Sequence, residues 1–185
     1  TIERLIGFAF VGLTTEVVSS LRDLIGVDYI HCFNMIEKTQ QSARAWFSYD
    51  PLTGILIERV SGLEAGYLVG NYLKVNWLGE KFWVHRLIWF HVTGEWPEYI
   101  DHKNGDGLDN SWSNLRNSTP SQNQGNSNRK SIGVEKHGRK WRARIWVKGV
   151  RIELGSYEEA EEAVEVYIKA HIKEFGEFSI FCRET

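Results

Sequence analysis

The stretch IDHKNGDGLDNSWSNLRNSTPSQNQGN, residues 100–126, places an aspartate beside a histidine and surrounds the pair with six asparagines. Asn, Gly, Ser and Asp are common in loops because their side chains satisfy nearby backbone groups. Carboxylate and carboxamide oxygens are also the ligands that hard divalent cations prefer. The stretch is therefore either a loop scaffold or a site for a metal ion and a base.

The order of the polar residues favours the second interpretation. Asp101 and His102 are adjacent, so on a strand their side chains point to opposite faces, and one can bind a metal while the other faces water. Asn114 lies twelve residues after His102, and Asn123 lies nine further on. We expect Asn123 on a short helix that has Pro120 near its start. A strand, loop, strand and helix can bring these polar side chains together.

The sequence upstream supplies more of the same scaffold. The segment YLKVNWLGEKFWVHRLIWFHVTG, residues 72–94, predicts a hairpin followed by a helix, with His85 at their junction. The segment FSYDPLTGIL, residues 47–56, has the Asp-Pro and Thr-Gly pairs of a turn between strands. Residues 1–45 predict mainly helix, and their role stays open.

With HRLIWFHVTGEWPEY leading into the opening stretch, residues 85–126 resemble the HNH endonucleases, also called the ββα-metal or His-Me finger family, in their phage homing-type form. The resemblance implies that His102 is the general base, that Asn114 orients it, and that Asp101 and Asn123 bind the metal. His85 is a further catalytic candidate, with a packed strand-end histidine as the alternative. Oxygen ligands of this kind suit Mg²⁺ or Mn²⁺.

The C-terminal part has a different pattern. In KWRARIWVKG, residues 140–149, alternation places three cations and an indole on one face, and the next strand adds another cation: Arg142, Arg144, Trp146, Lys148 and Arg151. An exposed Trp among arginines is typical of a nucleic-acid contact, with a solvated cationic sheet as the alternative. A helix follows, with Ser156 and Glu159 as its predicted capping box.

Residues 133–179 resemble the AP2 domain, which lays a three-stranded sheet in the major groove of DNA. The expected fold is therefore α+β: an N-terminal segment (1–45), a ββα-metal nuclease domain (46–127), a linker (128–131), and an AP2-like antiparallel sheet with one helix (132–181). The small, polar and basic run GNSNRKS, residues 125–131, has the composition of a flexible linker.

Composition narrows the class of protein. A hydrophobic content of 42%, a charged content of 25% and a net charge of −2 indicate a globular protein. Cys32 and Cys182 stand alone, so no structural zinc knuckle is expected, and two reduced thiols in a cytoplasmic protein are favoured over a disulfide. The apolar run LIGFAFVGL, residues 5–13, is too short to span a bilayer and lacks a signal-peptide pattern.

The two halves together predict a sequence-selective DNA endonuclease that uses one divalent ion and a histidine base on double-stranded DNA. The chain is expected to be a monomer or weak dimer; its one active centre predicts a nick in a single strand, unless the protein dimerises. The main alternative is a non-catalytic DNA-binding regulator in which the HNH part is only a scaffold. An RNA-directed nuclease is the third, less favoured because A-form RNA hides its major groove.

Overall fold

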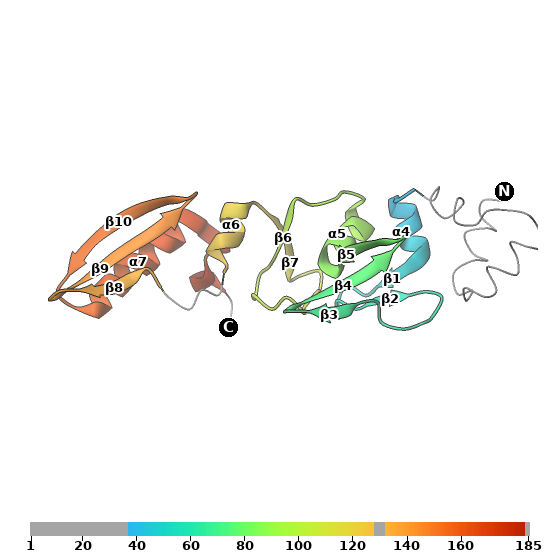
Figure 1. Cartoon of the computed structure of the whole chain (residues 1–185), viewed down its shortest axis with the longest axis horizontal. Helices are drawn as coiled ribbons and strands as arrows, with labels where there is room; N and C mark the ends of the chain where they lie inside the picture. The colour runs from blue at the N-terminus through green and yellow to red at the C-terminus, as the bar shows by residue number, and fades with distance from the viewer. Residues whose placement is uncertain (1–36, 128–131, 184–185) are drawn as a thin grey trace, which may run out of the picture. The chain divides into compact units, whose positions relative to one another are not determined.

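The computed structural model describes residues 37–127 and 132–183, and its fold is α+β (Figure 1). It divides into two compact units. The first holds the described residues up to Pro97 together with Gly107–Ser113, and the second holds Glu98–Asp106 and the described residues from Asn114 onward. The helix expected before residue 37 and the expected linker (128–131) lie outside the described residues, so the domain boundary there stays a prediction. No helix in the described ranges is long and apolar enough to cross a membrane.

The first unit is built from short strands and two helices. Its elements are α4 (Gln40–Trp46), β1 (Phe47–Tyr49), β2 (Leu56–Glu58), β3 (Tyr67–Val69), β4 (Tyr72–Trp77), β5 (Glu80–Trp83) and α5 (Val84–Thr93). β1 pairs with β2, and β3, β4 and β5 form an antiparallel sheet. The turn between β4 and β5 has positive φ at Leu78 (50°) and Gly79 (77°), which suits a tight hairpin. The predicted hairpin and following helix are confirmed.

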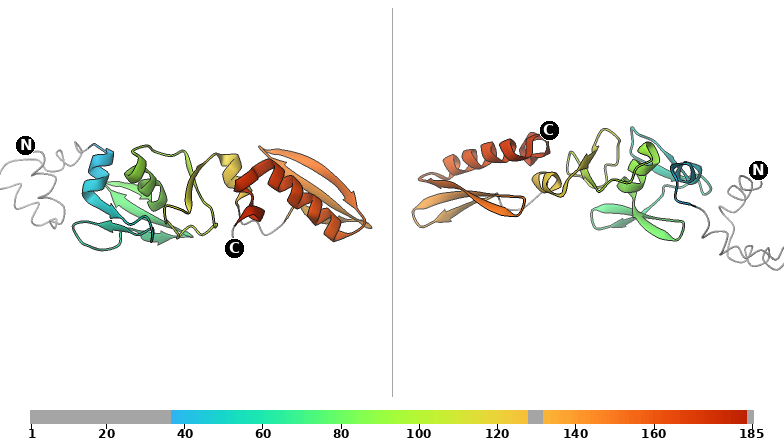
Figure 2. Two further views of the ribbon diagram at one scale, coloured as in Figure 1. Left: turned by 180° about the vertical axis from the view of Figure 1, so that it is seen from behind. Right: turned by 90° about the horizontal axis from the view of Figure 1, so that it is seen from above.

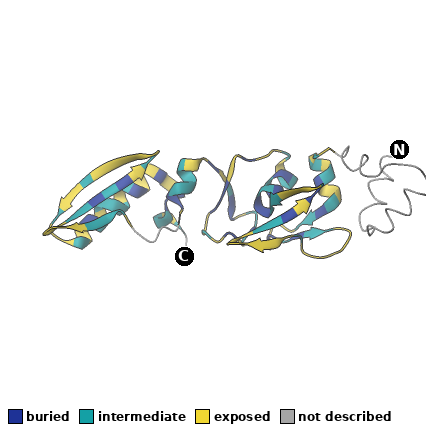
Figure 3. Ribbon diagram, viewed as in Figure 1, coloured by how far each residue is buried: buried dark blue, intermediate teal, exposed yellow. Residues whose placement is uncertain are grey.

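Large apolar side chains from the strands and α5 form the core of this unit, shown in dark blue in Figure 3. The most buried include Phe47, Trp77, Leu87 and Ile88, each 1% exposed or less. The C-terminal carbonyls of α5 are bonded by α4: Gln40 Nε2 and Arg44 Nη2 both donate to Val92 O, at 2.9 and 3.1 Å. α4 therefore satisfies backbone acceptors that a helix end leaves open.

The second unit begins with a two-stranded sheet and a short helix. β6 (Tyr99–His102) pairs antiparallel with β7 (Leu115–Ser118), and α6 (Pro120–Gly125) follows. Thr119 caps α6 through a reciprocal pair of bonds: Gln122 N donates to Thr119 Oγ1 at 3.2 Å, and Thr119 N donates to Gln122 Oε1 at 2.8 Å. Pro120 occupies the first turn, as predicted.

The rest of the second unit is a three-stranded antiparallel sheet and one long helix. The elements are β8 (Val134–His137), β9 (Lys140–Val147), β10 (Val150–Tyr157), α7 (Ala160–Phe175), and the 3-10 turns η1 (Gly176–Phe178) and η2 (Ile180–Cys182). The strand order is β10-β9-β8, and α7 lies along one face of this sheet (Figure 2). Ile145, Phe175 and Phe178 form the centre of the core between them. The expected sheet and helix are confirmed.

Two local predictions in this region are wrong. Ser156 does not cap the helix, because β10 continues through Tyr157 and α7 starts after Glu159, which makes no side-chain capping bond. Lys148 does not lie on the sheet face. It forms the β9–β10 turn with Gly149, at positive φ of 50° and 79°, because the alternation of the strand ends at Val147.

Candidate active site

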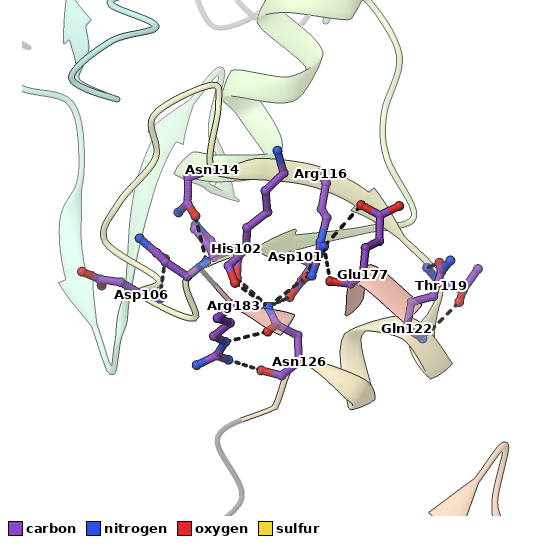
Figure 4. A network of polar contacts seen from close by, with 12 residues as sticks. Asp101, His102, Asp106, Asn114, Arg116, Thr119, Gln122, Asn126, Glu177 and Arg183 are labelled. Atoms are coloured by element: carbon purple, nitrogen blue, oxygen red, sulfur yellow. Dashed lines mark hydrogen bonds and ion pairs between the residues drawn. The ribbon is translucent and has the colours of Figure 1, made fainter. Parts of the chain in front are cut away.

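The Asp-His pair lies at the end of β6, in the second unit. Asp101 faces Arg116 across the β6–β7 pair, and His102 faces Leu115. Asp101 and His102 are buried, at 4% and 5% exposure. Asp101 Oδ2 accepts from Arg116 Nε at 2.8 Å and forms an ion pair with its Nη2 at 2.7 Å. Asn126 Nδ2 donates to both carboxylate oxygens, at 2.9 and 3.0 Å (Figure 4).

Asn114 holds the turn that follows His102. It immediately precedes β7, it is 7% exposed, and its carbonyl accepts from Lys103 N at 2.9 Å. Its side-chain Oδ1 accepts from Asn104 N at 3.0 Å. Asn104 Oδ1 in turn accepts from Asp106 N at 2.8 Å, which is the turn role expected of that asparagine. Asp101, His102 and Asn114 are therefore gathered at one end of the β6–β7 pair.

Asn126 is the site residue that the sequence did not single out. It is the C-cap residue of α6, it is 4% exposed, and its side chain contacts Asp101. Its Nδ2 also donates to His102 O at 2.7 Å. Asn123 lies three residues earlier on α6, and its backbone N–H donates to Thr119 O at 2.9 Å. The spacing of three residues, which puts both asparagines on one helix face, was the available signal.

Arg116 and Arg183 flank Asn126 and Asp101. Arg116 Nη1 donates to Glu177 O at 2.8 Å, and its guanidinium lies 3.9 Å from the Phe178 ring centroid. Arg183 Nε donates to Asn126 Oδ1 at 2.7 Å, and its Nη2 donates to Asn126 O. Burial lowers the pKa of Arg183, while Asp101 raises it and Arg116 lowers it further. Residues 176–183 thus contact Arg116 and Asn126, the two residues that bond to the buried carboxylate.

His85 lies in the first unit, in the first turn of α5. This is the strand–helix junction that the sequence predicted. The side chain is 9% exposed, and its ring stacks on Trp83 with centroids 6.2 Å apart and lies edge-on to Tyr72 at 5.5 Å. The packing fits the structural alternative, and a catalytic role for His85 stays a prediction.

The oxygen atoms in this cluster are of the kind that a divalent cation prefers, but those of Asp101 accept hydrogen bonds from Asn126 Nδ2 and Arg116 in this structure. The Asp101 carboxylate, the Asn126 carboxamide and the His102 carbonyl lie within one hydrogen-bonded cluster. Across the described ranges no group of three or more His, Cys, Asp or Glu side chains could hold a metal. An ion at Asp101 would have one carboxylate, carboxamide oxygens and water as its ligands.

The predicted DNA-binding face is partly neutralised by carboxylates. Alternation along β9 puts Arg142, Arg144 and Trp146 opposite the buried Ala143 and Ile145, and Trp146 is 49% exposed. Two of the predicted cations have acidic partners: Arg144 Nη2 lies 2.6 Å from Glu135 Oε2, and Arg151 Nε lies 3.2 Å from Glu153 Oε1. The DNA role of this face stays a prediction.

Residues 82–124 match the family model described as HNH endonuclease. This segment is therefore similar to the HNH endonucleases, a class of phosphodiester hydrolases, and it contains Asp101, His102, Asn114 and Asn123. The match ends two residues before Asn126.

A curated relative described as an uncharacterized HNH endonuclease of Acanthamoeba polyphaga mimivirus is 34% identical over 121 residues. The aligned region covers 61% of this chain and 64% of that relative, so the chain spans less than two thirds of the relative's length. No solved structure is significantly similar to the chain.

Proposed function

We propose that this chain is a DNA endonuclease that hydrolyses phosphodiester bonds with one divalent ion, Mg²⁺ or Mn²⁺, and with His102 as general base. The observation that carries the proposal is a coincidence of sequence and geometry. The segment that matches the HNH endonuclease model is the one in which Asp101, His102 and Asn114 meet at one end of the β6–β7 pair.

The side chains of the cluster have chemistry suited to this reaction. An imidazole can take a proton from an attacking water, which is the role proposed for His102. Asn114 bonds to the backbone of the turn after His102, and its proposed role is to orient the imidazole. Asp101, with Asn123 or Asn126, would hold the ion. When bound, a divalent ion polarises the phosphate and stabilises the charge on the leaving oxygen.

The C-terminal sheet is the proposed DNA-binding module, like the AP2 domain that it resembles in sequence. Arg142, Arg144, Trp146 and Arg151 would contact the duplex from the face opposite α7, and Lys148 would do so from the hairpin tip. Arginine can read guanine in the major groove, whereas lysine mainly anchors phosphate. The proposal is therefore a sequence-selective enzyme of the homing type that acts on double-stranded DNA as a monomer or weak dimer.

One observation favours the alternative of a non-catalytic DNA-binding regulator. Both oxygens of Asp101 accept hydrogen bonds from protein donors, which is how a purely structural carboxylate is also satisfied. The two functions differ in what the intact chain does to DNA in the presence of a divalent ion.

A plasmid assay separates them. Supercoiled DNA is incubated with wild type, His102→Ala and the control His137→Ala, in Mg²⁺, Mn²⁺ or EDTA. His137 is exposed on β8, so its loss removes an imidazole from outside the Asp101 cluster. We expect wild type and His137→Ala to nick the plasmid, and His102→Ala to be slower by about 100-fold or more. A wild-type chain that shifts DNA on a gel but leaves it intact with both ions would establish the regulator instead.

A further inference from the structure

The end of the chain reaches into the Asp101 cluster through one side chain. Arg183 follows η2 and binds Asn126 twice, through Nε to the side-chain oxygen at 2.7 Å and through Nη2 to the carbonyl. Gly105 lies against the same guanidinium, and any Cβ at that position would overlap it. Arg183 is therefore enclosed between α6 and the turn that follows His102 (Figure 4).

This contact fixes which way the Asn126 carboxamide faces. A guanidinium has only donors, so the atom of Asn126 that it meets must be the oxygen, Oδ1. The amino group of the same carboxamide then points to Asp101 and donates to both of its oxygens. The bonds on the two sides of the amide therefore require the same orientation, and neither is compatible with the flipped one.

That orientation opposes cation binding in two ways. It presents an N–H₂ group, rather than an oxygen ligand, to the carboxylate that would hold the ion. It also brings a second positive charge close to Asp101, which already forms an ion pair with Arg116. A divalent ion at Asp101 meets repulsion from both guanidinium groups, and only Arg183 comes from the C-terminal end of the chain.

We infer that Arg183 is a positioning residue that holds Asn126 in its cation-excluding orientation, so that a divalent ion at Asp101 and the Arg183–Asn126 contact are mutually exclusive. The inference rests on the proposed metal site of the nuclease. In this proposal, an ion at Asp101 requires the Asn126 carboxamide to turn and release Arg183. Because the two events are linked, a partner that separates Arg183 from Asn126 strengthens ion binding.

The first test measures Mn²⁺ binding to the full chain without DNA, from the paramagnetic resonance of free Mn²⁺. The variants are Arg183→Gln, which removes the charge and the fork of donors, and Lys173→Gln, which removes one charge from an exposed position on α7. We expect Arg183→Gln to bind Mn²⁺ at least about fivefold more tightly than wild type, and Lys173→Gln to match wild type. Unchanged or weaker binding by Arg183→Gln overturns the inference.

The second test uses wild-type protein and needs no variant. In the absence of metal the Arg183 Nε–H should give a slowly exchanging signal in a ¹H–¹⁵N spectrum, and Mg²⁺ should abolish it. A signal already lost to fast exchange without metal, or one that survives saturating Mg²⁺, overturns the inference.

The two proposals can fail separately. If the plasmid is nicked and Mn²⁺ binds equally tightly to wild type and Arg183→Gln, only the inference about Arg183 is refuted. If Mn²⁺ binding is the same in Asp101→Asn as in wild type, the metal site itself is not at Asp101 and both proposals fall.

Discussion

The Asp101–Arg116 ion pair gives the sharpest prediction for the stability of the second unit. Its side chains are only 5% and 12% exposed, so replacing Arg116 by methionine leaves a buried carboxylate without its cation. Removal of one partner of a buried pair costs about 3–5 kcal/mol. In Arg116→Met, Asp101 keeps its two hydrogen bonds from Asn126. We therefore expect the free energy of unfolding to fall by about 3 kcal/mol, near the lower limit of this range.

A double-mutant cycle tests the reasoning further. Asp101→Asn alone leaves Arg116 buried without a counter-charge and should also cost about 3 kcal/mol. The double variant removes both charges, so we expect its free energy of unfolding to fall by about 4 kcal/mol. The sum of the two single variants is about 6 kcal/mol, which gives a coupling energy of about 2 kcal/mol. Arg151→Met is the matched control, because its pair with Glu153 is 51% and 47% exposed and should contribute less than about 0.5 kcal/mol.

The assay is urea unfolding, followed by both far-ultraviolet circular dichroism and tryptophan fluorescence. Two probes are needed because a chain with two units can unfold in more than one step. Equal losses of stability in Arg116→Met and Arg151→Met would refute the reasoning, as would a double variant whose loss equals the sum of the single ones.

Three further predictions concern the same unit. Gly105→Ala and Gly138→Ala both place a side chain at positive φ (76° and 64°), which should lower the free energy of unfolding by about 1–2 kcal/mol. Only the Gly105→Ala side chain overlaps Arg183, so only this variant should bind Mn²⁺ more tightly. Burial lowers the pKa of His171, so the unfolded chain holds the proton more tightly and stability should fall as pH drops below about 6.5. His171→Asn should flatten that slope in urea titrations at several pH values, and an unchanged slope would exclude His171 as its source. Arg142→Gln should weaken duplex binding and reduce the salt slope by about one unit in gel shifts, and an unchanged slope would remove this residue from the interface.

Local sequence patterns predicted most of the elements. Alternation around Leu78-Gly79 predicted the β4–β5 hairpin, and Pro120 predicted the start of α6. The Ser156 cap failed because a serine that matches a capping pattern can equally continue a strand. In β10 the pairing of Ser156 with Arg142 and of Tyr157 with Trp141 outweighs the local signal.

The candidate site was predictable only where it is local. Asp101, His102 and Asn114 are close in sequence and are brought together by one pair of strands. Asn126 and Arg183 are 57 residues apart, and their contact depends on how the end of the chain packs after η2. The periodicity of apolar and polar residues cannot predict this contact, because a single pair of side chains that are distant in the sequence forms no repeating pattern.

The packing of residues 176–183 has a consequence for protein engineering. Glu177, Phe178 and Arg183 follow the predicted DNA-binding sheet in the chain, yet they contact Arg116 and Asn126. A chimera that exchanges everything after residue 127 for another recognition module would therefore also discard three supports of the Asp101 cluster. Under the proposed function, a chimera directed to a new target must exchange the sheet, β8 to β10, and retain residues 176–183.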